Sequence, residues 1–217
     1  MKQIFTKHEF PELIRIDSEK GRCYQTPEGD IYPAVSTVCG YKTAKHIQEW
    51  RKRVGEVEAN RISSRASQRG TEIHSLCEQY LTKGKANPSI FDQEMFNSLK
   101  PYLDQIDNIE ALEQPVYSKL VQVAGTVDLV ATLNGVPSII DWKTSKRVKT
   151  KEEIYGYFCQ AFFYGQSFFE HTGSRINQLV IIMGVDDHPP SVFIERAQDW
   201  RNNAMKLREE YRQATGL

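Results

Sequence analysis

The stretch from Gly125 to Thr144 constrains the fold more than any other part of the chain. Two β-rich runs, 126–133 and 136–142, flank Asn134-Gly135, a dipeptide typical of a tight β-hairpin turn. Antiparallel pairing around that turn sets residue 133 against residue 136, and the same register sets Asp128 against Asp141. The sequence therefore predicts two carboxylates on neighbouring strands, with Cβ atoms roughly 4.5–5.5 Å apart.

Two like charges opposite each other destabilise a hairpin unless something positive neutralises them. A hard divalent cation, which prefers carboxylate and water oxygens, suits this position. Lys143 follows Asp141 by two residues, so strand alternation places both side chains on one face. Two acids and an amine suit metal-assisted hydrolysis of a phosphate ester. The alternative is a surface hairpin with solvated charges, but the neighbouring residues favour a buried sheet: Val127, Leu129, Val130, Ile139 and Ile140.

The runs GTVD (125–128) and IIDWKT (139–144) resemble the active-site signature of the PD-(D/E)XK nuclease superfamily. Within it they look most like the RecB-like exonuclease branch, which includes phage-type DNA exonucleases and mitochondrial genome maintenance exonucleases. The resemblance implies an α/β fold with a restriction-endonuclease-like core, in which helices flank a central mixed β-sheet. It also implies a helical amino-terminal elaboration. We expect a single nuclease domain over 1–217, with the amino-terminal segment and helical cover in 1–110 and the catalytic sheet core and final helix in 111–217.

The resemblance implies a role for each residue of this centre. Mg²⁺ or Mn²⁺ would bind His74, Asp128, Asp141 and the backbone carbonyl of Trp142. Lys143 would position the attacking water or neutralise charge in the transition state. His74 ends the run RGTEIH (69–74), which looks like the family pattern R-G-T-x-x-H. The alternative is a structural histidine beside the apolar stripe of its helix.

Two residues of an aromatic-rich helix expected at about 151–171 are candidates for contacting the substrate backbone. Gln160 and Tyr164 lie four apart and therefore share a helix face. They resemble the Q-x-x-x-Y motif that lies beside the catalytic lysine in RecB-like nucleases. Without that resemblance both would be interpreted as core residues. Arg69 and Lys146 complete the set of residues expected to hold the DNA strand.

Ser36 and Thr37 lie in a segment, 32–38, that we expect to be a short strand or extended chain. It looks like the P-S-V-T-T segment of the same exonucleases, although Ala34 replaces the first serine of that pattern. Hydroxyl groups commonly contact phosphates. An ordinary strand explains these two residues equally well.

The remaining periodic segments predict the elements around this hairpin. Helices are expected at about 45–66, 69–83, 93–107 and 198–213, and strands at 115–123, 178–185 and 191–195, with the strand at 178–185 parallel to the core. Glu113 stands just before the first of these strands. It can assist the site through a water, but a solvated acid at a strand edge is the favoured interpretation.

Charge is balanced overall, with 28 Lys and Arg against 28 Asp and Glu, so its distribution is more informative than its sum. The segments 42–69 and 143–151 each carry a net charge of +5, and 92–113 carries −5. Two basic clusters beside a carboxylate site suit a bound polyanion. Ordinary solvated helix faces are the alternative.

The four cysteines, at 23, 39, 77 and 159, lack the spacing of a zinc or iron–sulfur site. They indicate a reduced, intracellular compartment. The chain shows neither an apolar run of membrane-spanning length nor a signal or transit peptide, so we expect no membrane partner. The expected location is the cytoplasm of a bacterial or phage-infected cell.

The resemblance implies a metal-dependent DNA exonuclease of recombination, repair or degradation, and we expect it to act on single-stranded ends. The alternatives are a duplex-degrading recombination exonuclease, a restriction-type endonuclease and a nucleic-acid-binding protein that does not cut. The sequence leaves open the polarity, the oligomeric state and any single-strand-annealing or replication partner.

Overall fold

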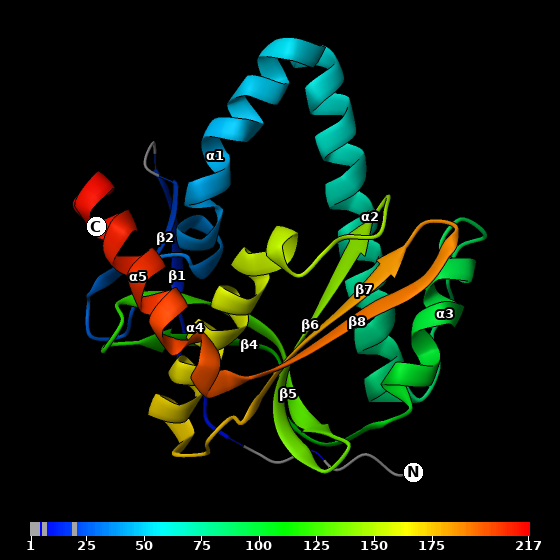
Figure 1. Cartoon of the computed structure of the whole chain (residues 1–217). Helices are drawn as coiled ribbons and strands as arrows, with labels where there is room; N and C mark the ends of the chain where they lie inside the picture. The colour runs from blue at the N-terminus through cyan, green and yellow to red at the C-terminus, as the bar shows by residue number, and fades with distance from the viewer. Residues whose placement is uncertain (1–4, 6–7, 19–20) are drawn as a thin grey trace.

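A computed structural model gives the fold of residues 5, 8–18 and 21–217 (Figure 1). Residues 1–4, 6–7 and 19–20 of the predicted single domain lie outside the described residues. In the part of the chain that is described, no helix is both long and apolar enough to span a membrane.

A five-stranded mixed sheet forms the centre of the molecule, in the order β4-β5-β6-β7-β8. Neighbouring strands are antiparallel except β6 and β7, which run parallel and are joined through a crossover helix. The strands are β4 (Ile106–Ser118), β5 (Val123–Leu133), β6 (Val136–Ser145), β7 (Gln178–Val185) and β8 (His188–Arg196).

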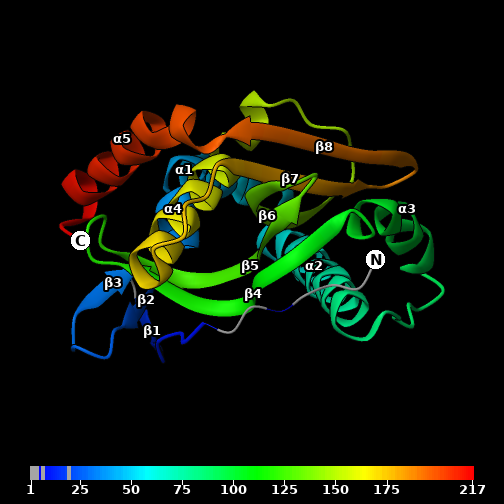
Figure 2. The same cartoon turned by 90° about the horizontal axis from the view of Figure 1, so that it is seen from below.

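Helices cover both faces of this sheet (Figure 2). The crossover helix α4 (Tyr155–Thr172), preceded by a short 3₁₀ turn at Glu152–Ile154, packs on one face with α5 (Ala197–Thr215). The other face is covered by α3 (Gln93–Leu103) and the second half of α2 (Glu56–Lys83). The predicted α/β architecture, with a mixed sheet flanked by helices, is confirmed.

Strand alternation divides the hairpin residues between two apolar cores. The pair Val130 and Ile139 belongs to the core under α4, whereas the pair Leu129 and Ile140 belongs to the core under α2 and α3. Val127 also belongs to the core under α4, so the alternation along β5 is interrupted near Asp128. Asp141 contacts Gln160 of α4, whereas Asp128 contacts His74 of α2.

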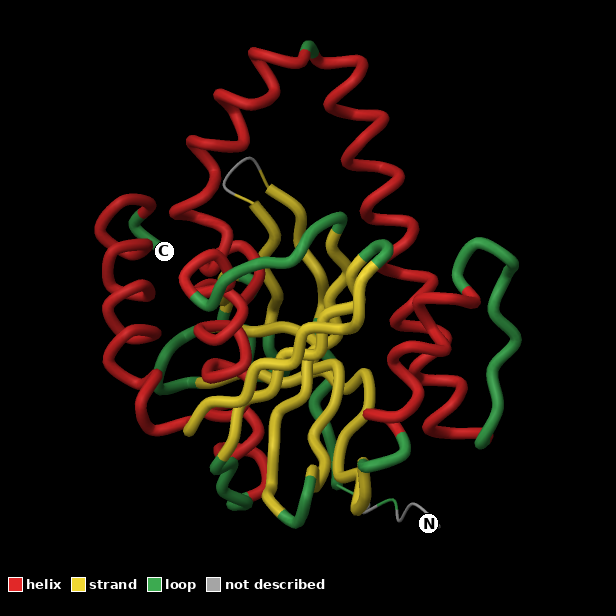
Figure 3. Tube along the Cα trace, turned by 45° about the vertical axis from the view of Figure 1, so that its right-hand side comes forward, coloured by secondary structure: helices red, strands yellow, loops and turns green. Residues whose placement is uncertain are grey.

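The amino-terminal elaboration is an arch of two helices that rises above the sheet (Figures 1 and 3). Helix α1 (Val35–Val54) and α2 meet at Gly55, whose φ of 85° and ψ of 148° suit glycine alone. At its base α1 packs against α4 and α5, whereas α2 packs against β6 and α3. Between 41 and 68 nearly every side chain is exposed or partly exposed, and only Ala59 is buried. The arch thus adds little to either core.

A small antiparallel sheet precedes the arch and packs beside the start of β5. Its strands are β1 (Ile14–Ser18), β2 (Gly21–Gln25) and β3 (Ile31–Pro33). Tyr32 of β3 and Tyr117 of β4 share a minor apolar cluster with Ala124.

Three sequence-based boundaries are wrong. The helices expected at 45–66 and 69–83 break at Gly55, because the break needs the glycine conformation found there. The segment expected to be extended over 32–38 turns helical at Val35, so Ser36 and Thr37 lie in the first turn of α1. Finally, β4 begins at 106 rather than 115, and its turn into β5 spans 119–122.

Gly125 allows α4 to approach β5 closely. A Cβ atom at this position would lie 3.0 Å from the hydroxyl of Tyr164, which is 5% exposed. We expect Gly125→Ala to lower the free energy of unfolding by about 1–3 kcal/mol, because overpacking forces buried groups apart. Urea unfolding measures this loss.

Gly40→Ala is the matched control for that substitution. Gly40 lies inside α1, and an added Cβ there meets no atom within 4 Å. Alanine is the better helix former, so this variant should be unchanged or slightly more stable. Equal destabilisation of both variants would contradict the packing explanation.

Candidate active site

The central sheet splits at the two aspartates of the hairpin. The pairing of β5 with β6 runs from Leu133 and Val136 to Leu129 and Ile140, in the register that the sequence predicts, and Asp128 and Asp141 are the next residues beyond the last pair. Beyond that level β5 stays paired with β4, whereas β6 stays paired with β7 as far as Ser145. The predicted register is confirmed, and the acids mark the point where the strands separate.

Side chains replace the lost ladder hydrogen bonds at Trp142. Its backbone N–H donates to Oδ2 of Asp128 at 3.4 Å, and its carbonyl accepts from Nε2 of His74 at 2.9 Å. A strand edge without such partners would leave buried backbone groups unsatisfied. His74 and Asp128 therefore complete the sheet as well as the site.

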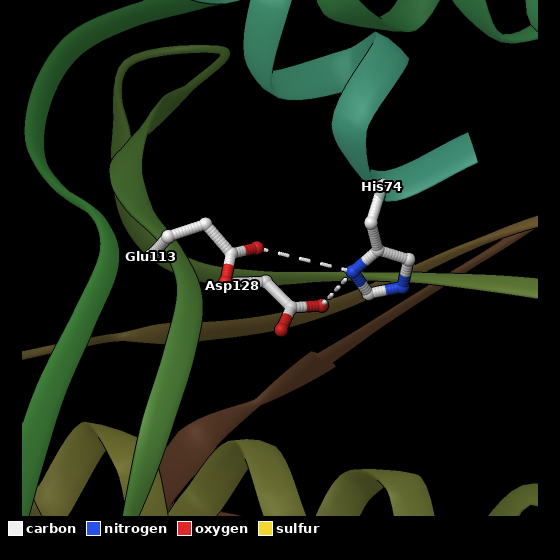
Figure 4. Close-up of side chains that lie close together, drawn as sticks. All are labelled: His74, Glu113 and Asp128. Atoms are coloured by element: carbon white, nitrogen blue, oxygen red, sulfur yellow. Dashed lines mark ion pairs between the residues drawn. The ribbon is translucent and has the colours of Figure 1, made fainter. Parts of the chain in front are cut away.

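The hydrogen bond to Trp142 fixes the orientation of the His74 ring. Since a carbonyl oxygen can only accept, Nε2 must carry a proton, and a neutral ring then leaves Nδ1 with a lone pair. That Nδ1 faces two carboxylates, Oδ2 of Asp128 at 3.4 Å and Oε1 of Glu113 at 3.9 Å (Figure 4). The arrangement calls for a positive charge, which is either a proton on the ring or a bound cation.

Glu113 is the member of this group for which a part in the site was only the alternative interpretation of the sequence. It lies inside β4, where the pairs on either side of it, Leu112 with Leu129 and Gln114 with Val127, set it opposite Asp128. Its φ of 49° breaks the regular strand, and its side chain is 36% exposed. Counting β4–β5 pairs back from the turn at 119–122 places Glu113 opposite Asp128. The sequence-based prediction started this strand at 115, so Glu113 was not expected to be paired.

Asp141 is held from two sides on the α4 face. Its Oδ2 forms an ion pair with Nζ of Lys143 at 2.5 Å, and its Oδ1 accepts from Nε2 of Gln160 at 3.0 Å. The carboxylate is almost fully buried, with its side chain 1% exposed. The ammonium of Lys143 also lies 5.1 Å from the centre of the Tyr157 ring.

The other predicted DNA contacts are more scattered. Tyr164 is buried under the hairpin, and Lys146 is exposed in the segment after β6. Arg69 forms an ion pair with Asp186 at 2.5 Å instead of facing the carboxylates. Thr37 donates to the carbonyl of Arg22. Ser36 is exposed in the first turn of α1, and its contact with DNA, like those of the other four, stays a prediction.

Burial and mutual repulsion shift the pKa values of the buried acids and bases. Burial, followed by the charge of Asp141, raises the pKa of Asp128 to about 8 against the opposing pull of Lys143 and His74. Burial lowers the pKa of His74, but the hydrogen bond to Glu113 and the charge of Asp128 outweigh it and raise the pKa overall. Burial also lowers the pKa of Lys143, but the negative charges of Asp141 and Asp128 outweigh it and raise that pKa overall. The centre thus has more negative charge than its own cations balance easily.

The residues present fit a divalent cation. Ligand atoms of His74, Glu113 and Asp128 all lie within 4.8 Å of one another. An ion with bonds of about 2.1 Å separates neighbouring ligand atoms by roughly 3–3.5 Å, close to the spacing of these groups. Oxygen donors with one imidazole suit Mg²⁺ or Mn²⁺, and the open side beside Glu113 leaves room for water.

We expect the metal-free protein to lose stability as the pH rises. The folded state holds a proton on Asp128 up to about pH 8, whereas the unfolded chain releases it near pH 3.8, the ordinary pKa of an aspartic acid side chain. This stabilisation is complete below pH 4 and declines as the pH approaches 8, and the raised pKa of His74 acts in the same direction. Between pH 6 and 8 the loss is about 2–3 kcal/mol.

Urea unfolding in EDTA at these two pH values checks the effect. Asp128→Asn should flatten the dependence, while Asp187→Asn, the same change at an exposed position, should keep the wild-type slope. An unaltered slope in Asp128→Asn would rule out this carboxyl as the source.

Comparison with known proteins agrees with this geometry. The sequence profile of the PD-(D/E)XK nuclease superfamily matches residues 91–213. The mouse protein named mitochondrial genome maintenance exonuclease 1 is 27% identical over 113 residues, which are 48% of this chain and 32% of the mouse protein. The human protein of that name is 24% identical over 132 residues, 55% of this chain and 38% of its own length. The chain thus spans about a third of the length of these relatives.

A solved Eubacterium rectale structure, titled as a candidate exonuclease, has a TM-score of 0.46 and 12% identity over 65% of this chain and 64% of that one. The profile match covers more than half of the chain and includes Glu113, both aspartates and Lys143. The chain belongs to the PD-(D/E)XK nuclease superfamily.

Proposed function

We propose that this chain is a metal-dependent DNA exonuclease that hydrolyses phosphodiester bonds from DNA ends. One observation carries the proposal: the β5–β6 split gathers three carboxylates, a histidine and a lysine at one point. A binding protein gains nothing from facing carboxylates toward a phosphate, because like charges repel. Family membership supports hydrolysis, and the names of the relatives support action from an end.

The metal would be Mg²⁺ or Mn²⁺, and two overlapping ligand sets are available for it. The first set is Nδ1 of His74, Glu113 and Asp128, which leaves the His74 bond to Trp142 intact. The second set is Asp128, Asp141 and the carbonyl of Trp142, whose oxygen has a second lone pair beside the one that accepts from His74. Asp128 belongs to both sets. A bound ion supplies Lewis acidity and lowers the pKa of its water.

The chain's own residues do the remaining work. Lys143, which lies beside Asp141, stabilises the negative charge that develops on the phosphate oxygens or orients the attacking water. Gln160 keeps the Asp141 carboxylate in one orientation, since it holds the oxygen that Lys143 does not. Tyr164 packs under the β5–β6 hairpin. We propose that the DNA backbone is held by Lys146, Arg69, Ser36 and Thr37.

Single-stranded ends are the substrate that we favour. The exposed arch carries most of the basic residues of 42–69, and the basic segment after β6 runs below it (Figures 1 and 3). Lys146 of that segment lies near enough to Glu58 of α2 to lower its pKa, after the larger effects of Arg61 and Arg65. Positive charge above and below one path suits a flexible anionic strand.

We further propose that residues 1–217 act as one nuclease domain, with 1–110 as cover and 111–217 as catalytic core. Recombination, repair or degradation of DNA inside a cell is the proposed setting. Four unpaired cysteines fit a reducing compartment, whether the cytoplasm of a bacterial or phage-infected cell or another.

Replacing Lys143 tests the catalytic assignment. Lys143→Ala and Lys143→Met should each lower the cleavage rate about 100-fold or more, as loss of one transition-state donor does elsewhere. Both variants should still melt cooperatively and bind Mn²⁺. Lys83→Ala, at the exposed end of α2, should cleave at the wild-type rate. Wild-type cleavage by a folded Lys143 variant would remove Lys143 from the mechanism.

DNA topology tests the exonuclease assignment. With Mg²⁺ or Mn²⁺, linear single strands labelled at either end should be degraded, circular single strands should survive, and EDTA should abolish all cleavage. The labelled end that is released first gives the polarity. Cutting of closed circles would point to an endonuclease, faster loss of duplex to a recombination exonuclease, and binding without any cleavage to a non-cutting protein.

A further inference from the structure

We propose that a groove on the far side of α4 binds an acidic peptide that carries a large apolar side chain. The groove has a volume of about 480 Å³ and lies between α4, α5 and the segment that joins α4 to β7. Nothing in the nuclease mechanism uses it. The two helices that flank it lie side by side in Figures 1 and 2.

The groove and the candidate active site use opposite faces of one helix. Each residue of an α-helix turns by about 100°, so Phe162 and Phe169 lie roughly 200° and 180° around α4 from Gln160. Gln160 holds Asp141, whereas both phenylalanines line the groove. An occupant of the groove therefore leaves the path to the metal site open.

The floor of the groove is apolar and incompletely covered. Phe162, Ile176 and Leu179 form it, and Phe169 remains 37% exposed at its rim. Leu120, from the turn between β4 and β5, is 66% exposed at the same groove. Apolar side chains gathered in a concave site gain free energy when another apolar group covers them.

The rim is positively charged. Arg175 and Arg201 line the groove from two different elements, and no acidic residue is among its lining residues. The guanidinium of Arg175 lies 5.8 Å from the centre of the Phe169 ring, and among the described residues neither arginine forms an ion pair with an acid. Guanidinium groups bind carboxylates through paired hydrogen bonds, so two arginines without a carboxylate partner favour an occupant with several acids.

Three side-chain amides favour a peptide as the occupant. Gln166, Asn177 and Gln198 border the groove, and a side-chain amide can both donate to a carbonyl and accept from an N–H. The amide nitrogen of Gln166 already donates to Glu170, which leaves its oxygen as an acceptor. A peptide backbone offers N–H and carbonyl groups at regular spacing, so these amides suit a chain segment.

Fluorescence anisotropy tests the proposal on the full chain. The probe is a fluorescein-labelled peptide with aspartates on both sides of a central Leu-Phe pair, and the control peptide has asparagine at every aspartate. We expect saturable binding of the probe and at least tenfold weaker binding of the control. Absence of binding up to about 1 mM, or equal binding of both peptides, would overturn the proposal.

Charge-reversal variants locate the binding. The double variant Arg175→Glu/Arg201→Glu should weaken binding at least tenfold, and Lys83→Glu/Lys206→Glu, the same change in charge at two exposed positions outside the groove, should leave it within about twofold. Circular dichroism verifies folding. Equal losses in both variants would mean general charge attraction and would contradict the assignment.

The same variants distinguish the peptide from two alternative occupants of the groove, a nucleic acid and a second copy of the chain. If a short oligothymidylate displaces the peptide and Arg175→Glu/Arg201→Glu also abolishes its binding, the groove is a nucleic-acid site and the proposal fails. A second copy of the chain would use an apolar segment, of which Ile90 and Phe91 are 83% and 87% exposed. Self-association that both the groove variant and Ile90→Ser/Phe91→Ser abolish would likewise overturn it. None of these readouts depends on cleavage, so failure of the nuclease assignment is seen separately.

Discussion

The separation of β5 from β6 is the constraint on which the rest of the structure depends. Parallel pairing with β7 holds β6 straight, antiparallel pairing with β4 holds β5, and the two strands part beyond Leu129 and Ile140. A sheet that opened here without side-chain partners would leave the peptide groups of Trp142 unsatisfied. His74 and Asp128 supply those partners, so the groups that can bind a metal also hold the opening together.

The opening also explains why acids can be concentrated in an apolar interior. Asp141 is balanced by Lys143 and Gln160, whereas Asp128 shares His74 with Glu113. In the second group the pKa of Asp128 rises to about 8, which marks this group as the part that lacks positive charge. The centre is therefore divided into a self-compensated half and a half that gains from a cation.

The sequence was most informative where contacts are local. The turn at Asn134-Gly135 fixes the register of Asp128 and Asp141, and helix periodicity fixes the spacing of Gln160 and Tyr164. Glu113 escaped because its role depends on the far end of β4 and on an irregular φ that no pattern announces. The secondary structure at Ser36 and Thr37 was predicted wrongly, because a short extended segment and the first turn of a helix have similar sequences when their tertiary neighbours are unknown.

The two ends of the arch differ in how strongly packing constrains them. Its two roots are fixed, since α1 packs against α4 and α5 while α2 packs against β6 and α3. Its crown at Gly55 is solvent-exposed and touches neither core. A change in the length of both helices by whole turns would therefore leave the two cores intact and would move only the exposed basic residues of the arch.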